Sequence, residues 1–449
     1  MSEYVLSIDS TRFIFLIFTA LILQIFIYRK SIISVFDPLA IYLANNSFSI
    51  AFVIYLFMDG EITNNTYLVS FFSCSIAFAI GVNIVAIKSN IPESTQISSS
   101  KKEIYESVKI SKILYLVLCL IVIIVVLANI FLISQTGELP LLSSNPDSAK
   151  VSMRQDGLGV IYRINNILIP LGISICLFKI FPPIPLINSA KSDRFILLCL
   201  LTILTVFFIS GGSKGVAISL LGFFVPCQLF NQYFKSHYTA TINKIIFLLL
   251  PIGVVSAFVI LVKNFNEVKY LDPLQGMIVR LIANGDAFYY FYKYDLIKKF
   301  DLNVFNYIAD SLNPLLGLLK MATYDTPFGE KLLIESINLT TGGFGPNAPY
   351  PVYGLVYFGF VGSCVFSFFI GCIISLVRTR FLSWTLKRPS ELNMVVYTTC
   401  FYHIMSLPID YVGFLTILYS SLLFITPVII ISKIFTVNDS IFSTSDKKD

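Results

Sequence analysis

The stretch I-L-Y-L-V-L-C-L-I-V-I-I-V-V-L-A-N-I-F-L-I, from Ile113 to Ile133, holds 21 residues without one charged side chain. About 20 apolar residues make a helix long enough to cross the roughly 30 Å hydrocarbon layer of a bilayer. We expect a helix because it satisfies its own backbone hydrogen-bonding groups in lipid. This stretch therefore predicts a membrane-spanning helix.

Similar apolar runs recur along most of the chain. They begin at Phe13, Leu39, Tyr67, Ile164, Phe195, Val216, Ile245, Val352, Leu392 and Val412. The 449 residues are 56% hydrophobic and 13% charged, and the mean hydropathy is +0.80. Such a composition is typical of proteins whose solvent is a bilayer. We expect an all-α integral membrane protein with about 11 transmembrane helices.

One long polar insertion, Lys263 to Pro351, interrupts this pattern. We therefore expect transmembrane helices 1–8 with short loops over residues 1–262, one large external loop over 263–351, and transmembrane helices 9–11 with a cytoplasmic tail over 352–449. Within the loop, Ser311 to Lys320 is mostly apolar but too short to span, so it predicts a surface-lying helix. The insertion is the candidate active-site region.

Basic residues between the apolar runs predict the orientation. The short connections that alternate from Arg29 and Lys30, including the one with Arg378 and Arg380, are rich in Lys and Arg. The short loops on the other side have almost none. Basic short loops stay in the cytoplasm, and long loops escape this rule. The N-terminus and the insertion are thus expected outside and the C-terminus inside.

Cations in two shorter external segments suit an anionic ligand. Arg154 and Arg163 lie in the loop before the run at Ile164, and arginine binds phosphate oxygens in a bidentate manner. Lys214 lies in the turn S-G-G-S-K-G, Ser210 to Gly215, whose backbone amides suit a phosphate as well. The alternatives are that Arg163 only extends to the membrane interface and that the turn is an ordinary hairpin.

The middle of the insertion reads G-M-I-V-R-L-I-A-N-G-D-A-F-Y-Y-F-Y, Gly276 to Tyr292. Helical spacing places Arg280 and Asn284 on one face. Asp286 follows as a candidate general base. Tyr289 and Tyr290 suit stacking on sugar rings, or they belong to an interfacial aromatic belt.

Two further features complete the candidate site. The insertion ends in G-G-F-G-P-N-A-P-Y-P, Gly342 to Pro351, a non-helical strap that contains Tyr350. His403 lies about one turn from the external end of the run at Leu392, where an ionisable group is a functional candidate. The alternative for His403 is a hydrogen-bonded core histidine.

Metal and nucleotide sites are not expected. All eight cysteines fall inside apolar runs without a C-x-x-C pair, so we interpret them as packing residues. The chain has no P-loop and no Rossmann glycine pattern. We therefore expect neither a cofactor nor ATP hydrolysis.

These motifs resemble those of the oligosaccharide repeat-unit polymerases of the O-antigen (Wzy) type. The shared features are one dominant late external loop, S-G-G-S-K-G opening a span, and the strap followed by Y-F-G-F-V-G, Tyr357 to Gly362. Some members have a glycine eleven positions after an arginine. That spacing is absent here. The residues eleven positions after Arg154, Arg163 and Arg280 are Asn165, Ser174 and Phe291.

The resemblance implies a glycosyltransferase of the bacterial inner membrane, with a periplasmic N-terminus and a cytoplasmic C-terminus. It would move the growing glycan from polyprenyl pyrophosphate onto a new lipid-linked repeat unit in O-antigen or related polysaccharide synthesis. The implied partners are polyprenyl-pyrophosphate-linked oligosaccharides, membrane lipid and a chain-length regulator, with no nucleic acid.

The roles that this reaction implies fall on the residues singled out above. Cations would neutralise the pyrophosphate, a carboxylate or imidazole would serve as the base, and polar and aromatic groups would contact the substrate. The cations are Arg280, Arg154, Arg163 and Lys214. The base is Asp286 or His403. The groups that contact the substrate are Asn284, Tyr289, Tyr290 and Tyr350.

Three alternatives stay open. An O-antigen ligase would share nearly all of these features and differ in its acceptor. A polysaccharide flippase or transporter is the alternative without catalysis, and charges within the spans would favour it. A lipid-linked-sugar transferase with its carboxylate in the first external loop would use Asp59 or Glu61.

Overall fold

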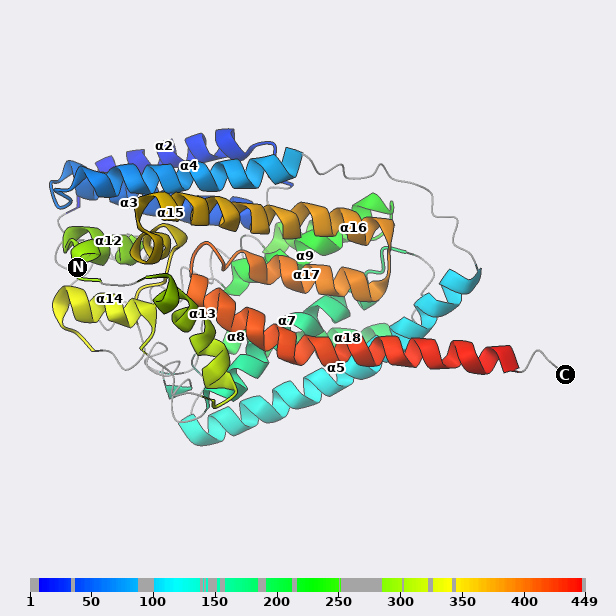
Figure 1. Ribbon diagram of the computed structural model, residues 1–449. Coiled ribbons are helices and arrows are strands. Elements are labelled where there is room, and N and C mark those ends of the chain that lie inside the picture. The colour runs from blue at the N-terminus through cyan, green and yellow to red at the C-terminus, as the bar shows by residue number, and fades with distance from the viewer. Residues whose placement is uncertain are drawn as a thin grey trace. The chain divides into compact units, whose positions relative to one another are not determined.

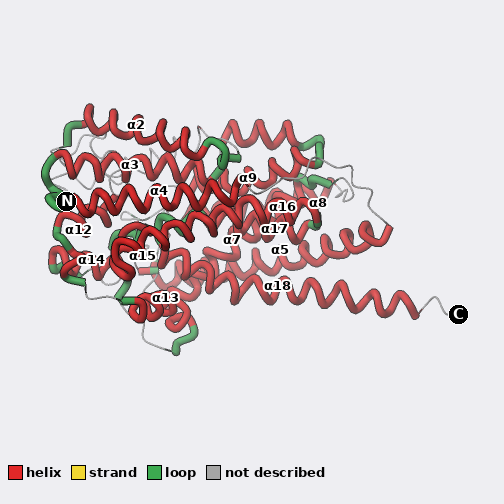
Figure 2. The backbone as a smooth tube through the Cα atoms, turned by 45° about the horizontal axis from the view of Figure 1, so that its top comes forward, coloured by secondary structure: helices red, strands yellow, loops and turns green. Residues whose placement is uncertain are grey.

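A computed structural model of the chain describes residues 8–33, 37–87, 101–137, 140, 143, 152–153, 158–184, 191–211, 216–249, 251, 285–300, 303–321, 326–340 and 345–445. These residues form helices joined by turns and contain no strand (Figure 2). The chain divides into two compact units. Unit 1 comprises Met1–Asn90, Leu261–Phe381 and His403–Thr416, and unit 2 comprises Ile91–Ile260, Leu382–Tyr402 and Ile417–Asp449.

Seven helices among the described residues are long and apolar enough to cross a membrane. They overlap the runs that begin at Phe13, Leu39, Tyr67, Ile113, Ile164, Phe195 and Val352, which confirms the all-helical class and the long apolar helices. The seven are Ser10–Tyr28, Leu39–Met58, Asn65–Ala86, Lys112–Thr136, Gly159–Ile180, Asp193–Ser210 and Tyr350–Lys387.

The other expected runs also fall on helices where the structure describes them. The run at Val216 is α9, Val216–Tyr233, and the run at Leu392 lies in α17, Glu391–Ile404. Shorter apolar helices, Thr239–Leu249 and Tyr411–Pro427, hold the described parts of the runs at Ile245 and Val412. The count of about 11 spans and the external position of the insertion stay predictions.

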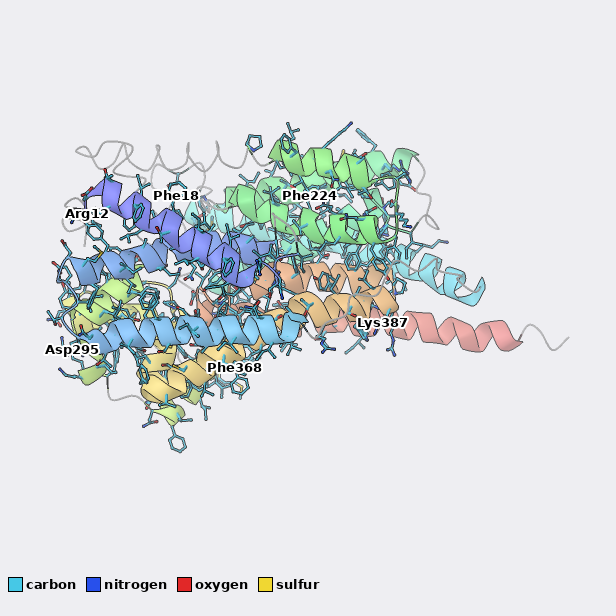
Figure 3. All side chains as sticks on the ribbon, turned by 90° about the horizontal axis from the view of Figure 1, so that it is seen from above. Arg12, Phe18, Phe224, Asp295, Phe368 and Lys387 are labelled. Carbon is cyan, nitrogen blue, oxygen red and sulfur yellow. The ribbon has the colours of Figure 1, made fainter. Side chains whose placement is uncertain are left out.

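Four helices form the apolar part of unit 1, and Figures 1 and 2 show them running side by side. Large apolar side chains such as that of Phe18, labelled in Figure 3, are exposed along α2. An outward apolar surface of this kind is what lipid requires. The helices are α2 (Ser10–Tyr28), α3 (Pro38–Met58), α4 (Asn65–Ile87) and α15 (Tyr350–Ser375).

Small residues bring α4 and α15 into backbone contact. A Cβ added at Gly81 would overlap the carbonyl oxygen of Phe368, and one at Gly371 would overlap that of Phe78. Ser363, Ser367 and Ser375, at spacings of four and eight residues, are fully buried along α15. Small residues at helix interfaces let backbones approach closely in membranes. This seam joins α4 to the part of α15 that follows Gly359.

Gly359 divides α15 into two segments, because its φ of 66° and ψ of −169° are not helical. A Cβ at Gly354, before the break, would lie 3.2 Å from the Cα of Ser363, after the break. The rings of Phe358 and Phe366 lie 5.5 Å apart. The first segment therefore folds back against the start of the second.

Three α-helices and one short 3-10 helix, Leu296–Lys298, occur in the described part of the insertion, and they belong to unit 1. The α-helices are α12 (Asp286–Lys293), α13 (Val304–Leu318) and α14 (Phe328–Ile337). Asn303 caps α13 by accepting from the backbone amides of Phe305 and Asn306. The helix expected at Ser311 to Lys320 is thus part of α13 but begins earlier than predicted. Figure 1 shows α13 running crosswise to α2, α4 and α15.

Arg378, which the basic-residue pattern assigns to a cytoplasmic connection, lies in a π-helical turn, Leu376–Phe381, and is fully buried. Its cytoplasmic position stays a prediction. Its Nε lies 3.1 Å from Oδ1 of Asp37, which is fully buried too, and a second guanidinium nitrogen donates to the other oxygen of that carboxylate. A buried ion is stable only when it is paired, and Asp37 supplies the partner.

Unit 2 contains α5 (Lys101–Thr136), α7 (Gly159–Ile180), α8 (Lys191–Ser210), α9, α17 and most of α18 (Tyr411–Ser445). The ends of α7 and α17 meet in a second buried ion pair. There, Nζ of Lys179 lies 2.9 Å from Oε1 of Glu391. Buried charge in this unit therefore also serves to join helices.

Candidate functional site

The helix α12 is held on the bundle by its aromatic residues. The rings of Tyr292 and Tyr67 stack with centroids 4.8 Å apart, and Phe288 meets Phe71 edge to face at 5.1 Å. Tyr289 is buried and stacks on Phe52. Aromatic pairs in these geometries stabilise a contact beyond the area they bury. Tyr289 thus packs against the bundle.

Asp286 and Tyr290 face the other side of this short helix. Both are half-buried, and Asp286 is in the first turn, where a carboxylate is favoured by the helix dipole. Burial raises the pKa of Tyr290, and the charge of Asp286 raises that pKa further. The structure therefore brings Asp286 and Tyr290 together, one turn apart.

The first external loop of the predicted topology meets α12 through an ion pair. The Nζ of Lys293 lies 2.5 Å from Oε2 of Glu61 and donates to the hydroxyl of Tyr289 at 3.0 Å. Burial lowers the pKa of Lys293, but the bonds to Glu61 and Tyr289 outweigh it and raise the pKa to about 12. Glu61, a carboxylate considered above as a catalytic group, is therefore paired with a cation.

Asp295 ends this edge of the site and lies beside the first turn of α4 (Figure 3). It has a left-handed φ of 49°. The Nζ of Lys298 lies 2.5 Å from Oδ2 of Asp295, and the hydroxyl of Tyr67 donates to Oδ1 of the same carboxylate at 2.5 Å. The bond from Lys298, followed by that from Tyr67, lowers the pKa of Asp295. Asp295 stays ionised and anchors the loop after α12.

A second polar cluster joins α13, α14 and α15. Lys331 of α14 lies 3.1 Å and 3.2 Å from the two carboxylate oxygens of Asp310, on α13. The hydroxyl of Tyr357, on the first segment of α15, donates to the same carboxylate. We call these three residues the Asp310 cluster. It places a carboxylate, an ammonium and a phenol in direct contact, mostly shielded from solvent.

Aromatic rings surround the Asp310 cluster. Tyr307 and Tyr411 share a hydrogen bond of 2.5 Å between their hydroxyls. Tyr353 lies 4.6 Å from Tyr357 and 5.0 Å from Phe328, centroid to centroid. An apolar wall strengthens the electrostatic interactions inside it, because the local dielectric constant is low.

The described part of the strap contacts α14, Tyr411 and α4 in unit 1. Gly345 and Gly329 are in backbone contact, since a Cβ on either would overlap backbone atoms of the other segment. The amide of Tyr411 donates to the carbonyl of Ala348 at 3.0 Å. Tyr350 is buried and stacks on Phe78 of α4 at 4.9 Å. The described non-helical part of the strap is 345–349, two residues shorter at this end than predicted, because Tyr350 and Pro351 already belong to α15.

His403 is buried near the end of α17, just before the turn that meets the strap. Its carbonyl accepts from the hydroxyl of Ser406 at 2.7 Å and from the amide of Ser406 at 3.1 Å. In the same turn, Pro408 accepts from the amide of Tyr350 at 3.5 Å. The backbone of this turn connects two residues that the sequence singled out, His403 and Tyr350.

The remaining predicted residues are spread over the chain. Arg163 is half-buried in the first turns of α7, in unit 2. Four others lie outside the described residues, and their roles stay predictions: Arg154, Lys214, Arg280 and Asn284.

The Asp310 cluster was not predicted. The available signal was a single carboxylate inside an otherwise apolar helix, Y-I-A-D-S-L, Tyr307 to Leu312. Charge in such a setting indicates a buried partner. No group of three or more metal-ligating side chains occurs within the described ranges. The Asp310 cluster itself brings together a carboxylate, an ammonium and a phenol, all of which are groups that can exchange protons.

No family model, no curated protein and no solved structure matches this chain.

Proposed function

We propose that the protein joins lipid-linked oligosaccharide repeat units by transferring the growing glycan from polyprenyl pyrophosphate to a new lipid-linked unit. The observation that carries the proposal is the Asp310 cluster, where helices of the insertion and α15 gather a carboxylate, an ammonium and a phenol. Acid–base groups and a cation are what this transfer needs.

The proposed reaction is a displacement at the anomeric carbon of the donor glycan. A hydroxyl of the acceptor sugar attacks that carbon, the bond from the carbon to the pyrophosphate oxygen breaks, and a new glycosidic bond forms. The hydroxyl proton goes to a base, for which Asp286 and His403 are the candidates from the sequence. The leaving group is the polyprenyl pyrophosphate, whose charge Arg280, Arg154, Arg163 and Lys214 would neutralise.

A transporter is the second candidate, and one observation favours it. Arg378 and Asp37 form a fully buried ion pair between helices of unit 1. Ionisable residues inside membrane proteins often mark the path of a substrate or proton. A transporter of lipid-linked oligosaccharide would use this pair to change conformation rather than to make a bond.

Analysis of the surface glycan in a deletion strain separates these functions. If the protein is the polymerase, the strain attaches single repeat units to its surface lipid, because synthesis, flipping and ligation continue. Loss of a ligase would leave long polymer on the polyprenyl carrier. Loss of a flippase would trap single units inside the cell. Either of the last two patterns would overturn the polymerase proposal.

A residue-level test addresses the predicted phosphate contact. Arg280→Ala is expected to abolish chain extension while the protein is still made and inserted. Arg280→Lys is expected to restore extension only in part, since lysine keeps the charge and loses the bidentate fork. Polymer of normal length from the alanine variant would count against this role.

A further inference from the structure

The exposed face of α13 is apolar. Phe305 is 81% exposed, and Ile308, Leu312 and Leu319 are exposed on the same face at helical spacing. Ala309 and the half-exposed Leu316 fill the face between them. The exposed residues from Val304 to Leu319 include no charged side chain. In water this face would form a costly apolar patch.

The opposite face of α13 is polar and points into the protein. Asp310 is bound by Lys331 and Tyr357, and Tyr307 shares a hydrogen bond with Tyr411. This arrangement is the inverse of a helix on the surface of a water-soluble protein, where apolar residues face inward. The surroundings of the outer face are therefore expected to be less polar than water.

The position of α13 continues the apolar surface of the bundle. Figure 1 shows α13 crosswise to the long helices, so its axis lies close to the plane of a membrane that those helices would span. Tyr307 rests on α15, with its ring 4.8 Å from that of Phe358. Just after the break at Gly359, Val361 is 73% exposed and Val365 is exposed too. Apolar surface thus extends from α15 to the residues next to α13.

We propose that α13 is an interfacial membrane helix whose apolar face binds the acyl chains of the leaflet at this end of α15. Such helices lie in the membrane plane and insert their apolar face about 5–10 Å into the boundary between headgroups and acyl chains. The proposal rests on the spans and on the two faces of α13, and it holds whichever reaction the protein performs. It places the Asp310 cluster at the depth of the lipid headgroups.

Tryptophan fluorescence in bilayers tests this placement, because the chain has one native tryptophan, Trp384. In a Trp384→Phe background, the full-length protein is reconstituted into phosphatidylcholine nanodiscs, with and without bromine atoms on the acyl chains. Phe305→Trp and Leu312→Trp report on the outer face of α13. Glu335→Trp, on the exposed side of α14, is the matched control.

The expected result is blue-shifted emission from Phe305→Trp and Leu312→Trp that loses most of its intensity in brominated lipid. The control is expected to emit as in water and to keep its intensity. Water-like emission from both α13 variants would overturn the proposal. Blue-shifted emission that brominated lipid does not quench would also overturn it, because a protein surface would then cover α13 instead of lipid.

Discussion

The helices α13 and α14 follow each other in the insertion and contact the same residue, Tyr357, yet they face opposite surroundings. α14 buries the apolar residues Phe328, Leu332 and Leu333 and exposes Glu335, although it also buries Glu330 and exposes Ile337 at its end. α13 buries Ser311, holds the half-buried Asp310 against Lys331 and Tyr357, and exposes Phe305 and other apolar residues. The difference indicates that the boundary between water and lipid runs between two neighbouring helices.

The comparison also shows why periodicity is only half of the information. Both helices have an apolar and a polar face, so both give a helical pattern in the sequence. The pattern does not state which face is inside, because that depends on the solvent around the helix. For α13, the contacts of Asp310 with Lys331 and Tyr357 show that the polar face points into the protein.

The largest effect is expected where α14 is locked by the strap. Gly329→Leu would place a side chain on the backbone of Pro346, which has no room to move because Gly345 is in contact as well. Overpacking typically costs about 1–3 kcal/mol and more where backbone must shift. In detergent, the midpoint temperature of thermal unfolding should fall strongly.

The matched control for that variant is Gly222→Ala in α9, where a Cβ would lie 3.5 Å from a ring carbon of Tyr402 in ordinary contact. Its thermal stability is expected to equal or exceed that of the original protein, since alanine favours the helix. Equal stability of the Gly329 variant would contradict the close packing of the strap on α14.

A double-mutant cycle on Asp310 and Lys331 tests the polar face of α13. Asp310→Ala leaves the Lys331 ammonium without its carboxylate and Tyr357 without its acceptor, and should lower the free energy of unfolding by about 1–3 kcal/mol. Lys331→Ala should add little once Asp310 is gone. Additive losses, measured by chemical denaturation, would show that the two side chains do not interact.

A charge exchange tests the outer faces. Phe305→Asp is expected to destabilise the protein in bilayers by about 1 kcal/mol or more, because a carboxylate would enter the boundary of the acyl layer. Glu335→Leu on α14 is expected to change stability by less than about 0.5 kcal/mol, as surface substitutions do. Equal effects of the two substitutions, compared by unfolding in nanodiscs, would remove the contrast between the helices.

The smallest effect is expected at Asp295, through pH. Its pKa is lowered in the folded protein, so its contribution to stability is present above the unfolded pKa of about 4 and is lost as the pH falls below it. Asp295→Asn keeps a residue that tolerates the left-handed backbone and removes the charge. The thermal stability of this variant should depend less on pH between about 5 and 2. An unchanged pH dependence would exclude a role for this carboxylate.

The sequence predicted the long apolar helices because hydrophobicity is a local property. The overlap of seven long helices with expected runs follows from this. Partners distant in sequence were not predicted. Tyr289 was expected to meet a substrate or a membrane interface, and its stacking on Phe52, 237 positions earlier, was not predicted. The Asp310 cluster was missed for the same reason, since its members come from three helices.

The pair of Asp37 and Arg378 has a consequence for how the chain is made. The two residues are 341 positions apart, so the ribosome releases Asp37 long before it adds Arg378. At about 5–20 residues per second, the carboxylate waits roughly 20–70 s for its partner. Asp37 caps α3 in the turn before the apolar span that begins at Leu39, and during that time its carboxylate can be stable only where water reaches it. We expect this turn to become buried only after the segment with Arg378 has been synthesised, so that the first two helices pack in their final arrangement late.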